Sequence, residues 1–215
     1  MIRHFKNWGV IKFLLHVKDA WLTQNDEHLF RALRFAQKTG LLNQDNQLIV
    51  DVGASVGHTC LFFAKYFSDV EIIGFEPDPT AFAIAKINTE HIKRIKLHNM
   101  AVSDHSGEAM LQITRNQVSS SLNKLNANAA KESGHSEQLN VVNELKVVVT
   151  TLDEQIPDRG VLIMKLDAQG HELNVLRGAT ATLRRTMLVV SEMSVHKIYD
   201  GGCSYHEVDK FLREI

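Results

Sequence analysis

A cluster of side chains that could transfer a proton follows the apolar segment GVLIMKLDA. Asp167 lies at the end of this segment, Gln169 follows it, and His171 and Glu172 open the next predicted helix. Glu192 occupies a similar place in the later apolar segment VVSEMS. An imidazole or a carboxylate can take the proton of a hydroxyl group, so these five residues are candidate catalytic residues. Each could instead be structural, because acidic residues stabilise helix starts and an imidazole can satisfy a backbone carbonyl.

A second feature, LIVDVGASVGHTC at residues 48–60, is typical of a strand, a tight turn and a helix start that together bind a small ligand. Apolar residues lead into Asp51, and Gly53 and Gly57 follow. The dinucleotide fingerprint G-x-G-x-x-G has a middle glycine where the backbone approaches a pyrophosphate. Ser55 occupies that position here. The turn therefore favours a ligand without a bridging pyrophosphate.

An acidic residue stands where a ribose would need it. Glu76 closes the apolar segment VEIIGFEP, about 20 residues after Gly57, the spacing of the residue that binds ribose hydroxyls in such sheets. A carboxylate can accept hydrogen bonds from two neighbouring hydroxyls. Glu76 and the glycine turn together indicate a nucleoside-binding site, although a solvated loop carboxylate is the structural alternative.

Six segments resemble, in order, the FkbM-type methyltransferases: DVGASVGHT, GFEPDP, NMAVSDHSG, VVVTTLDE, MKLDAQGHELNVLRGA and VVSEMS. The resemblance covers about residues 45–200. It implies an S-adenosylmethionine-dependent enzyme with the class I methyltransferase fold. It also implies that Asp51 and the turn formed by Gly53, Ala54, Ser55 and Gly57 make the methionine-side and backbone contacts with the cofactor. Glu76, with Asp78 nearby, would hold the ribose. The segment that contains Ala101, Val102 and Asp104 would lie against the adenine.

Two of these residues have further readings. Asp167 is a candidate for holding the cofactor as well as for catalysis. Asp104 could equally stabilise the turn SDHSG, because aspartate commonly bonds to the backbone of such turns.

The elements that must position these residues alternate between strand and helix patterns. Such alternation predicts an α/β fold: a doubly wound, mostly parallel, Rossmann-like sheet with helices on both faces. Ligands then bind at the carboxyl ends of the strands. Strands are expected at 48–52, 70–77, 95–103, 107–114, 160–168 and 187–194 and in ELKVVVTTLDEQ. Helices are expected at 26–42 and after the strands at 48–52, 70–77 and 160–168. A long polar loop is expected at 115–143.

The two ends of the chain raise separate expectations. Residues 1–44 are expected to form an N-terminal helical segment and residues 45–215 the methyltransferase domain. The basic and apolar start reads as a helix at the domain edge, with a membrane-surface helix or a signal peptide as alternatives. A class I sheet normally ends in two antiparallel strands, and the sequence stops at HEVDKFLREI, where they should begin. We therefore expect an open sheet edge through which the protein could oligomerise.

The overall composition narrows the function classes. The net charge is −1, which gives no attraction to nucleic acid, and no apolar run is long enough to span a membrane. The two cysteines are far apart, which suggests free thiols in the cytoplasm. No pair of histidines has helical metal-ligand spacing, so no metal is expected, although Asp167, Glu172 and Glu192 could bind a magnesium-like ion.

The sequence thus predicts an S-adenosylmethionine-dependent methyltransferase that methylates a hydroxyl of a small molecule or glycan. A nicotinamide-dependent oxidoreductase is one alternative, and the missing middle glycine argues against it. The other is a non-catalytic protein that keeps the cofactor fold for binding a partner.

Overall fold

The computed structural model of the 215-residue chain describes residues 2–7, 10–15, 29, 33–36, 38, 40, 48–115, 120–126, 140–192 and 199–215. A five-stranded sheet forms its centre, with strand order β10-β9-β3-β4-β5. Every neighbouring pair in it is parallel. The strands are β3 (Leu48–Val52), β4 (Glu71–Phe75), β5 (Ile95–His98), β9 (Val161–Leu166) and β10 (Thr186–Ser191). The predicted α/β fold with a mostly parallel sheet is therefore confirmed.

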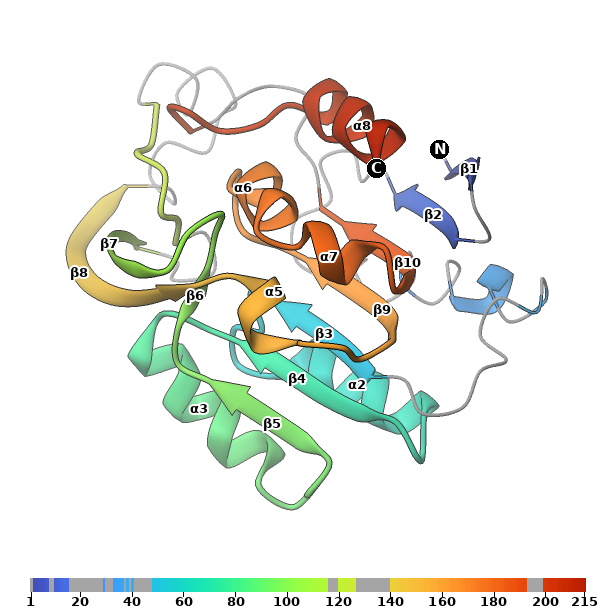
Figure 1. Cartoon of the computed structure of the whole chain (residues 1–215). Helices are drawn as coiled ribbons and strands as arrows, with labels where there is room; N and C mark the ends of the chain where they lie inside the picture. Colours follow the sequence, from blue (N-terminus) through green and yellow to red (C-terminus); the bar gives the residue numbers. More distant parts are fainter. Residues whose placement is uncertain are drawn as a thin grey trace.

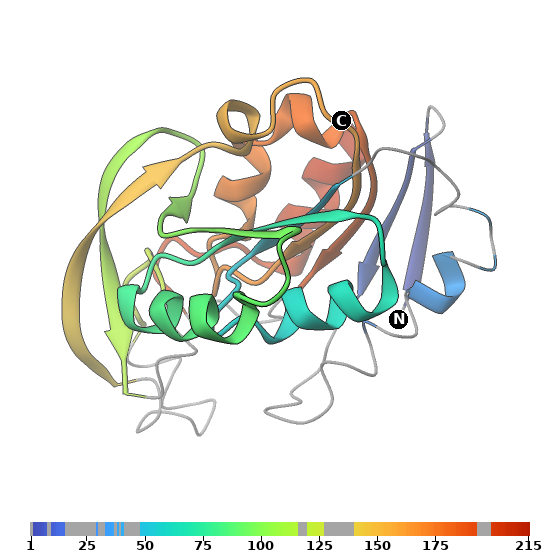
Figure 2. The ribbon, with the colours of Figure 1, turned by 90° about the horizontal axis from the view of Figure 1, so that it is seen from below.

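Helices cover both faces of the sheet (Figure 1). Turning the molecule by 90° shows the sheet between two helical layers (Figure 2). One layer contains α2 (His58–Tyr66) and α3 (Pro79–Thr89). The other contains α5 (Leu152–Gln155), α6 (Glu172–Arg177), α7 (Thr180–Leu183) and α8 (Tyr205–Glu214).

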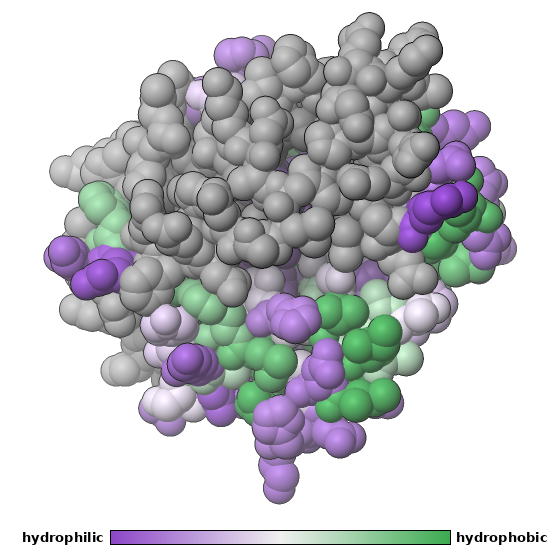
Figure 3. All heavy atoms as spheres, turned by 180° about the vertical axis from the view of Figure 1, so that it is seen from behind, coloured by the Kyte–Doolittle hydropathy of each residue, from purple (hydrophilic) through white to green (hydrophobic). Residues whose placement is uncertain are grey.

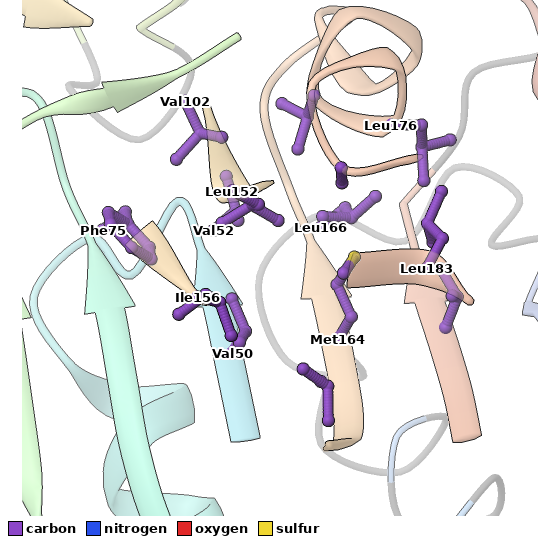
Figure 4. Close-up of a cluster of buried hydrophobic side chains, with 14 of the residues drawn as sticks. Val50, Val52, Phe75, Val102, Leu152, Ile156, Met164, Leu166, Leu176 and Leu183 are labelled. Carbon is purple, nitrogen blue, oxygen red and sulfur yellow. The ribbon is translucent and has the colours of Figure 1, made fainter. Parts of the chain in front are cut away.

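The alternation of side chains along the strands divides the core into two clusters. Val50 and Val52 of β3 point towards the layer that contains α5 to α8, where they pack with residues such as Leu176 and Leu183 (Figure 4). Ile49 of the same strand joins the cluster on the α2 side. Because side chains alternate between the faces of a sheet, Asp51 also points towards α2, where it is fully buried.

A second sheet stands beside the first and consists of β6 (Ala101–Val102), β7 (Gly107–Thr114) and β8 (Val141–Thr150), in the order β6-β8-β7. The strand expected at 95–103 is therefore wrong as a single element. It breaks after His98, and residues 101–102 pair with β8 instead of continuing β5. The change of sheet places Ala101 and Val102 of β6 in the small sheet.

The N-terminal helix expected at the start of the chain is also wrong. Residues Ile2–Asn7 (β1) and Val10–Leu15 (β2) form an antiparallel hairpin. The hairpin lies beside β10, at the end of the sheet where we expected an open edge (Figure 1). Within the predicted helix 26–42, residues 33–36 are helical. The division of the chain at residue 44 remains a prediction.

The surface of the described part is mixed in polarity. Apolar patches alternate with polar ones on the face seen from behind (Figure 3). Exposed apolar side chains include Tyr66 of α2 and Ile84 and Ile87 of α3. Among the residues described, no helix has the length and apolar character needed to cross a bilayer.

Candidate functional site

The site lies where the strand order reverses. From β3 the chain moves outward to β4 and β5, and it later returns to β9 on the other side of β3. Ligands of doubly wound sheets bind at this point, beyond the carboxyl ends of the strands. A cleft opens there. Residues at and just beyond the ends of β3, β4 and β9 line one part of it: Val52, Gly53, Ser55, Phe75, Glu76, Pro77, Asp167, Ala168, Gln169 and His171. Residues of neighbouring segments line the rest: Met100, Ala101, Val102, Leu111, Ser120, Ser121 and Leu122.

Gly53 brings the two central strand ends into contact. Its φ is +76°, a conformation that L side chains rarely adopt. A Cβ atom at this position would lie 2.0 Å from the backbone oxygen of Asp167. The turn after β3 and the end of β9 therefore touch through backbone atoms, and only glycine permits that approach.

The turn satisfies its own backbone groups. The N–H groups of Gly53 and Ala54 both donate to the carbonyl oxygen of Phe75, each at 3.0 Å. The N–H of Gly57 donates to Ala54 O at 2.8 Å. Ser55 has a positive φ of 47° although it is not glycine. Such a backbone is strained by about 1–3 kcal/mol, and strain of this kind is frequent where a chain binds a ligand.

Glu76 is one of the polar residues that line the cleft. Its Oε2 accepts a hydrogen bond from the N–H of Ser55 at 2.7 Å, and its Oε1 accepts one from the N–H of Asp78 at 2.8 Å. The side chain is buried, and burial raises its pKa to about 7, against the lowering effect of these two bonds. The carboxyl group is thus fixed in position and retains lone pairs that can accept further hydrogen bonds.

Three predicted cofactor residues shape the site without lining the cleft. Asp78 caps α3, because its Oδ1 accepts from the N–H of Thr80 at 2.8 Å. Asp104 is exposed, and its Oδ1 lies 2.7 Å from His105 Nδ1 and 3.1 Å from Ser103 Oγ. Gly57 is the residue before α2, with a φ of 87°. Their contacts position the chain around the cleft.

A largely buried lysine, which sequence reasoning missed, joins the two central strands. Lys165 of β9 is the register partner of Asp51 in β3. Its Nζ lies 3.3 Å from Asp51 Oδ1 and 3.4 Å from Asp167 Oδ2, and it donates to the backbone oxygen of Gly53 at 3.3 Å. Burial opposes its charge, but the two carboxylates raise the pKa of Lys165 above its ordinary value.

Asp51 therefore acts below the cleft and does not line it. Its other oxygen, Oδ2, accepts from the thiol of Cys60 at 3.3 Å. Burial raises the pKa of Asp51, while Lys165 opposes this rise. Ala54 likewise lies beneath the turn and belongs to the apolar cluster on the α2 side.

Asp167 brings this buried charge to the cleft wall. Burial alone would raise its pKa, but Lys165 and hydrogen bonds from Glu192 and Gln169 hold the pKa below its ordinary value. Gln169 Nε2 donates to Asp167 Oδ1 at 2.8 Å, and Tyr199 donates to Gln169 Oε1 at 3.3 Å. Gln169 adopts a positive φ of 49°, so it is the second strained residue at the cleft.

Glu192 and Glu172 differ from the roles expected of them. Glu192 is exposed as a residue, yet its carboxyl group contacts Asp167, whose negative charge raises the pKa of Glu192 to about 9. It is therefore protonated at neutral pH and donates to Asp167. Glu172 is buried, and its Oε1 accepts from the N–H groups of Ala168 and Gly170 at 2.9 and 3.2 Å. Glu172 thus supports the turn after β9 from behind.

His171 lines the cleft, but both of its ring nitrogens have partners. Nε2 lies 2.9 Å from Ser103 Oγ, and Nδ1 lies 3.0 Å from Asn123 Oδ1. Because the amide oxygen only accepts, Nδ1 carries the proton and Nε2 accepts from the serine. Burial lowers the pKa of His171 to about 4, so the ring is neutral at physiological pH.

Residues 120–126, which we call the strap, cross the cleft beside this histidine. Ser121 exchanges two backbone hydrogen bonds with Gln112 of β7, and its hydroxyl donates to the carbonyl oxygen of Gln169 at 2.8 Å. Asn123 donates to the carbonyl oxygen of Gly170 at 3.0 Å. The strap thereby connects the small sheet to the turn after β9. The remainder of the predicted loop 115–143 lies mostly outside the described residues.

The cleft combines an apolar wall with few polar groups. Phe75, Met100, Val102, Leu111 and Leu122 supply the apolar side. Glu76 and Asp167 supply carboxyl groups at opposite sides of the Gly53 turn. Such a cleft suits a ligand that has an apolar ring, neighbouring hydroxyls and a cationic group, because each part finds a matching surface.

The structure thus brings together eight of the residues selected from sequence and places the others in supporting positions. The cleft is lined by Gly53, Ser55, Glu76, Ala101, Val102, Asp167, Gln169 and His171. Lys165, Ser103 and Asn123 were missed. Lys165 had a signal, because it interrupts the apolar run VLIMKL as Asp51 interrupts LIVDV. Among the residues described, there is no cluster of three or more side chains arranged to hold a metal.

Comparison with known proteins agrees with this geometry. The sequence model of the methyltransferase FkbM domain matches residues 51–215. The 2-O-methyltransferase NoeI of Sinorhizobium fredii is 25% identical over 171 residues, which cover 77% of this chain and 70% of NoeI.

Two further relatives are methyltransferase 1 of Beauveria bassiana, 25% identical, and methyltransferase sdnD of Sordaria araneosa, 26% identical. These alignments each cover 62% of this chain, but only 59% and 60% of the relatives' own lengths. The family model extends over most of the chain, from the end of β3 through the whole site to the last residue. The chain therefore belongs to the FkbM family of methyltransferases.

Proposed function

We propose that the protein transfers a methyl group from S-adenosylmethionine to a hydroxyl group of a small molecule or glycan. The observation that carries this proposal is Glu76, a buried carboxyl group fixed by two backbone N–H bonds in an apolar cleft at the switch point. A ribose offers two neighbouring hydroxyls that can donate to it. Oxygen as the acceptor atom is supported by the name of NoeI, a 2-O-methyltransferase.

The residues of the cleft fit this donor. Glu76 would hold the ribose, and the apolar wall that includes Met100 and Val102 would contact the adenine. Asp167, which is ionised, would attract the cationic part of the donor. The donor supplies a methyl group already activated on a sulfonium. The protein must therefore hold acceptor and methyl group in line and exclude water.

The acceptor hydroxyl must also lose its proton. Asp167 and His171 line the cleft and are both able to take it. The nitrogens of His171 are already bonded to Ser103 and Asn123, which favours Asp167. A positioned base contributes about 10²–10⁴-fold to turnover. Once the acceptor is known, Asp167→Asn should lower kcat by more than His171→Ala does. The opposite order would identify His171 as the base.

The proposal is tested by isothermal titration calorimetry with S-adenosylhomocysteine and by transfer of a labelled methyl group to an extract, with products identified by mass. Binding together with one labelled product supports it. Binding of reduced nicotinamide dinucleotide without binding of S-adenosylhomocysteine would replace it with an oxidoreductase. Binding of S-adenosylhomocysteine without any product across extracts and glycans would favour a non-catalytic binding protein.

A further inference from the structure

Lys165 contacts both the turn after β3 and the end of β9, and it is not part of the cleft wall. Lys165 stands in β9 between Met164 and Leu166, which are fully buried on the opposite face of the sheet. A lysine in such a strand must lose most of its hydration, which is unfavourable unless its charge is paired. The cost indicates that the ammonium group has a task at this position.

The ammonium group is surrounded by three acceptors, and each belongs to a different part of the site. Asp51 Oδ1 lies at 3.3 Å on β3, Gly53 O at 3.3 Å in the turn and Asp167 Oδ2 at 3.4 Å beyond β9. Lys165 donates hydrogen bonds to Gly53 O and Asp167 Oδ2, and its contact with Asp51 Oδ1 is an ion pair. Lys165 therefore bridges the turn and the strand end that already touch at Gly53.

We propose that Lys165 is a positioning residue for the methyl donor: its ammonium group clamps the glycine turn to the end of β9 and holds the Asp167 carboxylate at the cleft wall. The inference rests on the proposed function, because it assigns Lys165 a role towards that donor. Asp51 has the same role at one remove, since it holds Lys165 from below.

The alternative is a buried ion pair between Asp51 and Lys165 that serves folding alone. The two readings differ in how donor binding depends on pH. Without Lys165, Asp167 would keep only its bonds to Gln169 and Glu192, and burial would raise its pKa. Asp167 would then take up a proton more readily as the pH falls, and donor affinity would fall with it. A purely structural lysine produces no such pH dependence.

Other titratable groups around this cluster must be controlled. Lys165 and Asp167 are faced by Asp51 on β3, Glu76 after β4, Glu172 on α6, and Glu192 and Tyr199. Glu76 itself titrates at about pH 7. Lys165 also contributes to lowering the pKa of Glu76, so the ratio of the variant's affinity to the wild type's at each pH must be compared with the same ratio in an Asp167→Asn background, where only the effect through Glu76 remains.

The experiment measures the Kd of S-adenosylhomocysteine by calorimetry from pH 5 to pH 8 for wild type, Lys165→Met and Lys96→Met. Lys96 is the matched control, since it is an exposed lysine of β5 that pairs with Glu71 at 3.1 Å, away from the cleft. We expect Lys165→Met to weaken binding roughly tenfold or more at pH 7 and further at pH 5. Lys96→Met should match wild type throughout.

Two further variants identify the cause. In an Asp167→Asn background, Lys165→Met should still weaken binding through loss of the clamp on the turn, but the additional loss of affinity at low pH should be absent, because the carboxylate that Lys165 holds is absent. If Lys165→Met does not fold, the variant Asp51→Asn/Lys165→Met removes both buried charges together, and the same weakening and pH dependence are expected of it.

The outcomes separate the two levels of inference. Wild-type protein that does not bind S-adenosylhomocysteine overturns the proposed function and this inference with it. Wild-type binding together with a folded Lys165 variant of unchanged affinity, or of lowered affinity with a constant ratio across pH, overturns this inference alone. A ratio of the variant's affinity to the wild type's that decreases as the pH is lowered, with no such decrease in the Asp167→Asn background, supports it.

Discussion

Replacing Glu76 with glutamine should separate the contribution of this residue to binding from its contribution to folding. The substitution keeps the shape of the side chain and removes its charge. Hydrogen bonds to a charged acceptor contribute about 1.5–3 kcal/mol. If ribose hydroxyls donate to Glu76, Glu76→Gln should weaken S-adenosylhomocysteine binding by roughly 10- to 150-fold, since about 1.4 kcal/mol corresponds to tenfold.

The effect on folding should have the opposite sign at high pH. The pKa of Glu76 rises from its ordinary value of 4.5 to about 7 in the folded protein, mainly through burial. The folded state therefore binds this proton more tightly than the unfolded state. Stability from this group is fully present below pH 4.5 and is lost as the pH rises through 7. A shift of this size corresponds to about 3 kcal/mol between these limits.

Glutamine does not titrate, so the variant escapes this loss. It forfeits one backbone hydrogen bond, because its amide nitrogen cannot accept from Ser55 or Asp78, but this loss is the same at every pH. The free energy of unfolding of the variant relative to wild type should therefore increase by up to about 3 kcal/mol between pH 5 and pH 8. Urea denaturation at both values measures it.

The result that refutes this reasoning is specific. If the variant binds S-adenosylhomocysteine as tightly as wild type, Glu76 does not contact the donor. If the difference in unfolding free energy is constant across pH, the carboxyl group is not buried in the way described. Glu71→Gln is a suitable control, since Glu71 is the acidic residue at the start of β4, and its pKa is lowered, chiefly by its hydrogen bond with Arg159.

Three further predictions concern stability. Burial lowers the pKa of His171 from 6.5 to about 4. Its contribution to stability should therefore be present above pH 6.5 and should be lost, by up to about 3 kcal/mol, as the pH falls through 4. Denaturation of His171→Gln, which lacks this titration, checks the prediction. Gly53→Ala should destabilise the protein by at least about 2 kcal/mol more than Gly201→Ala, because both have a positive φ but only Gly53 would clash with Asp167, and thermal melts compare them. Glu172→Ala should cost about 2–5 kcal/mol in urea denaturation, because two partly buried backbone N–H groups lose their acceptor. An unchanged midpoint would mean that water replaces it.

The sequence alone indicated the fold class and selected Glu76 as the candidate ribose-binding residue. Apolar runs such as LIVDV and VLIMKL predicted buried parallel strands, and β3 and β7 begin and end where expected, at residues 48–52 and 107–114. Glu76 could be selected because its position depends on local features alone, the end of one strand and the spacing from a glycine turn. Both are properties of consecutive residues, and consecutive residues can be read from a sequence.

Tertiary structure decided which residues meet. The hydrophobic pattern of residues 95–103 fits one strand, but pairing of residues 101–102 with β8 breaks it, and β8 is supplied by a distant part of the chain. Lys165 and Asp51 form an ion pair because the register of two parallel strands aligns them. The two nitrogens of His171 are occupied because β6 and the strap bring Ser103 and Asn123 to it. Periodicity reports which face of an element is buried, whereas these pairings depend on register and chain path between segments that the sequence separates widely.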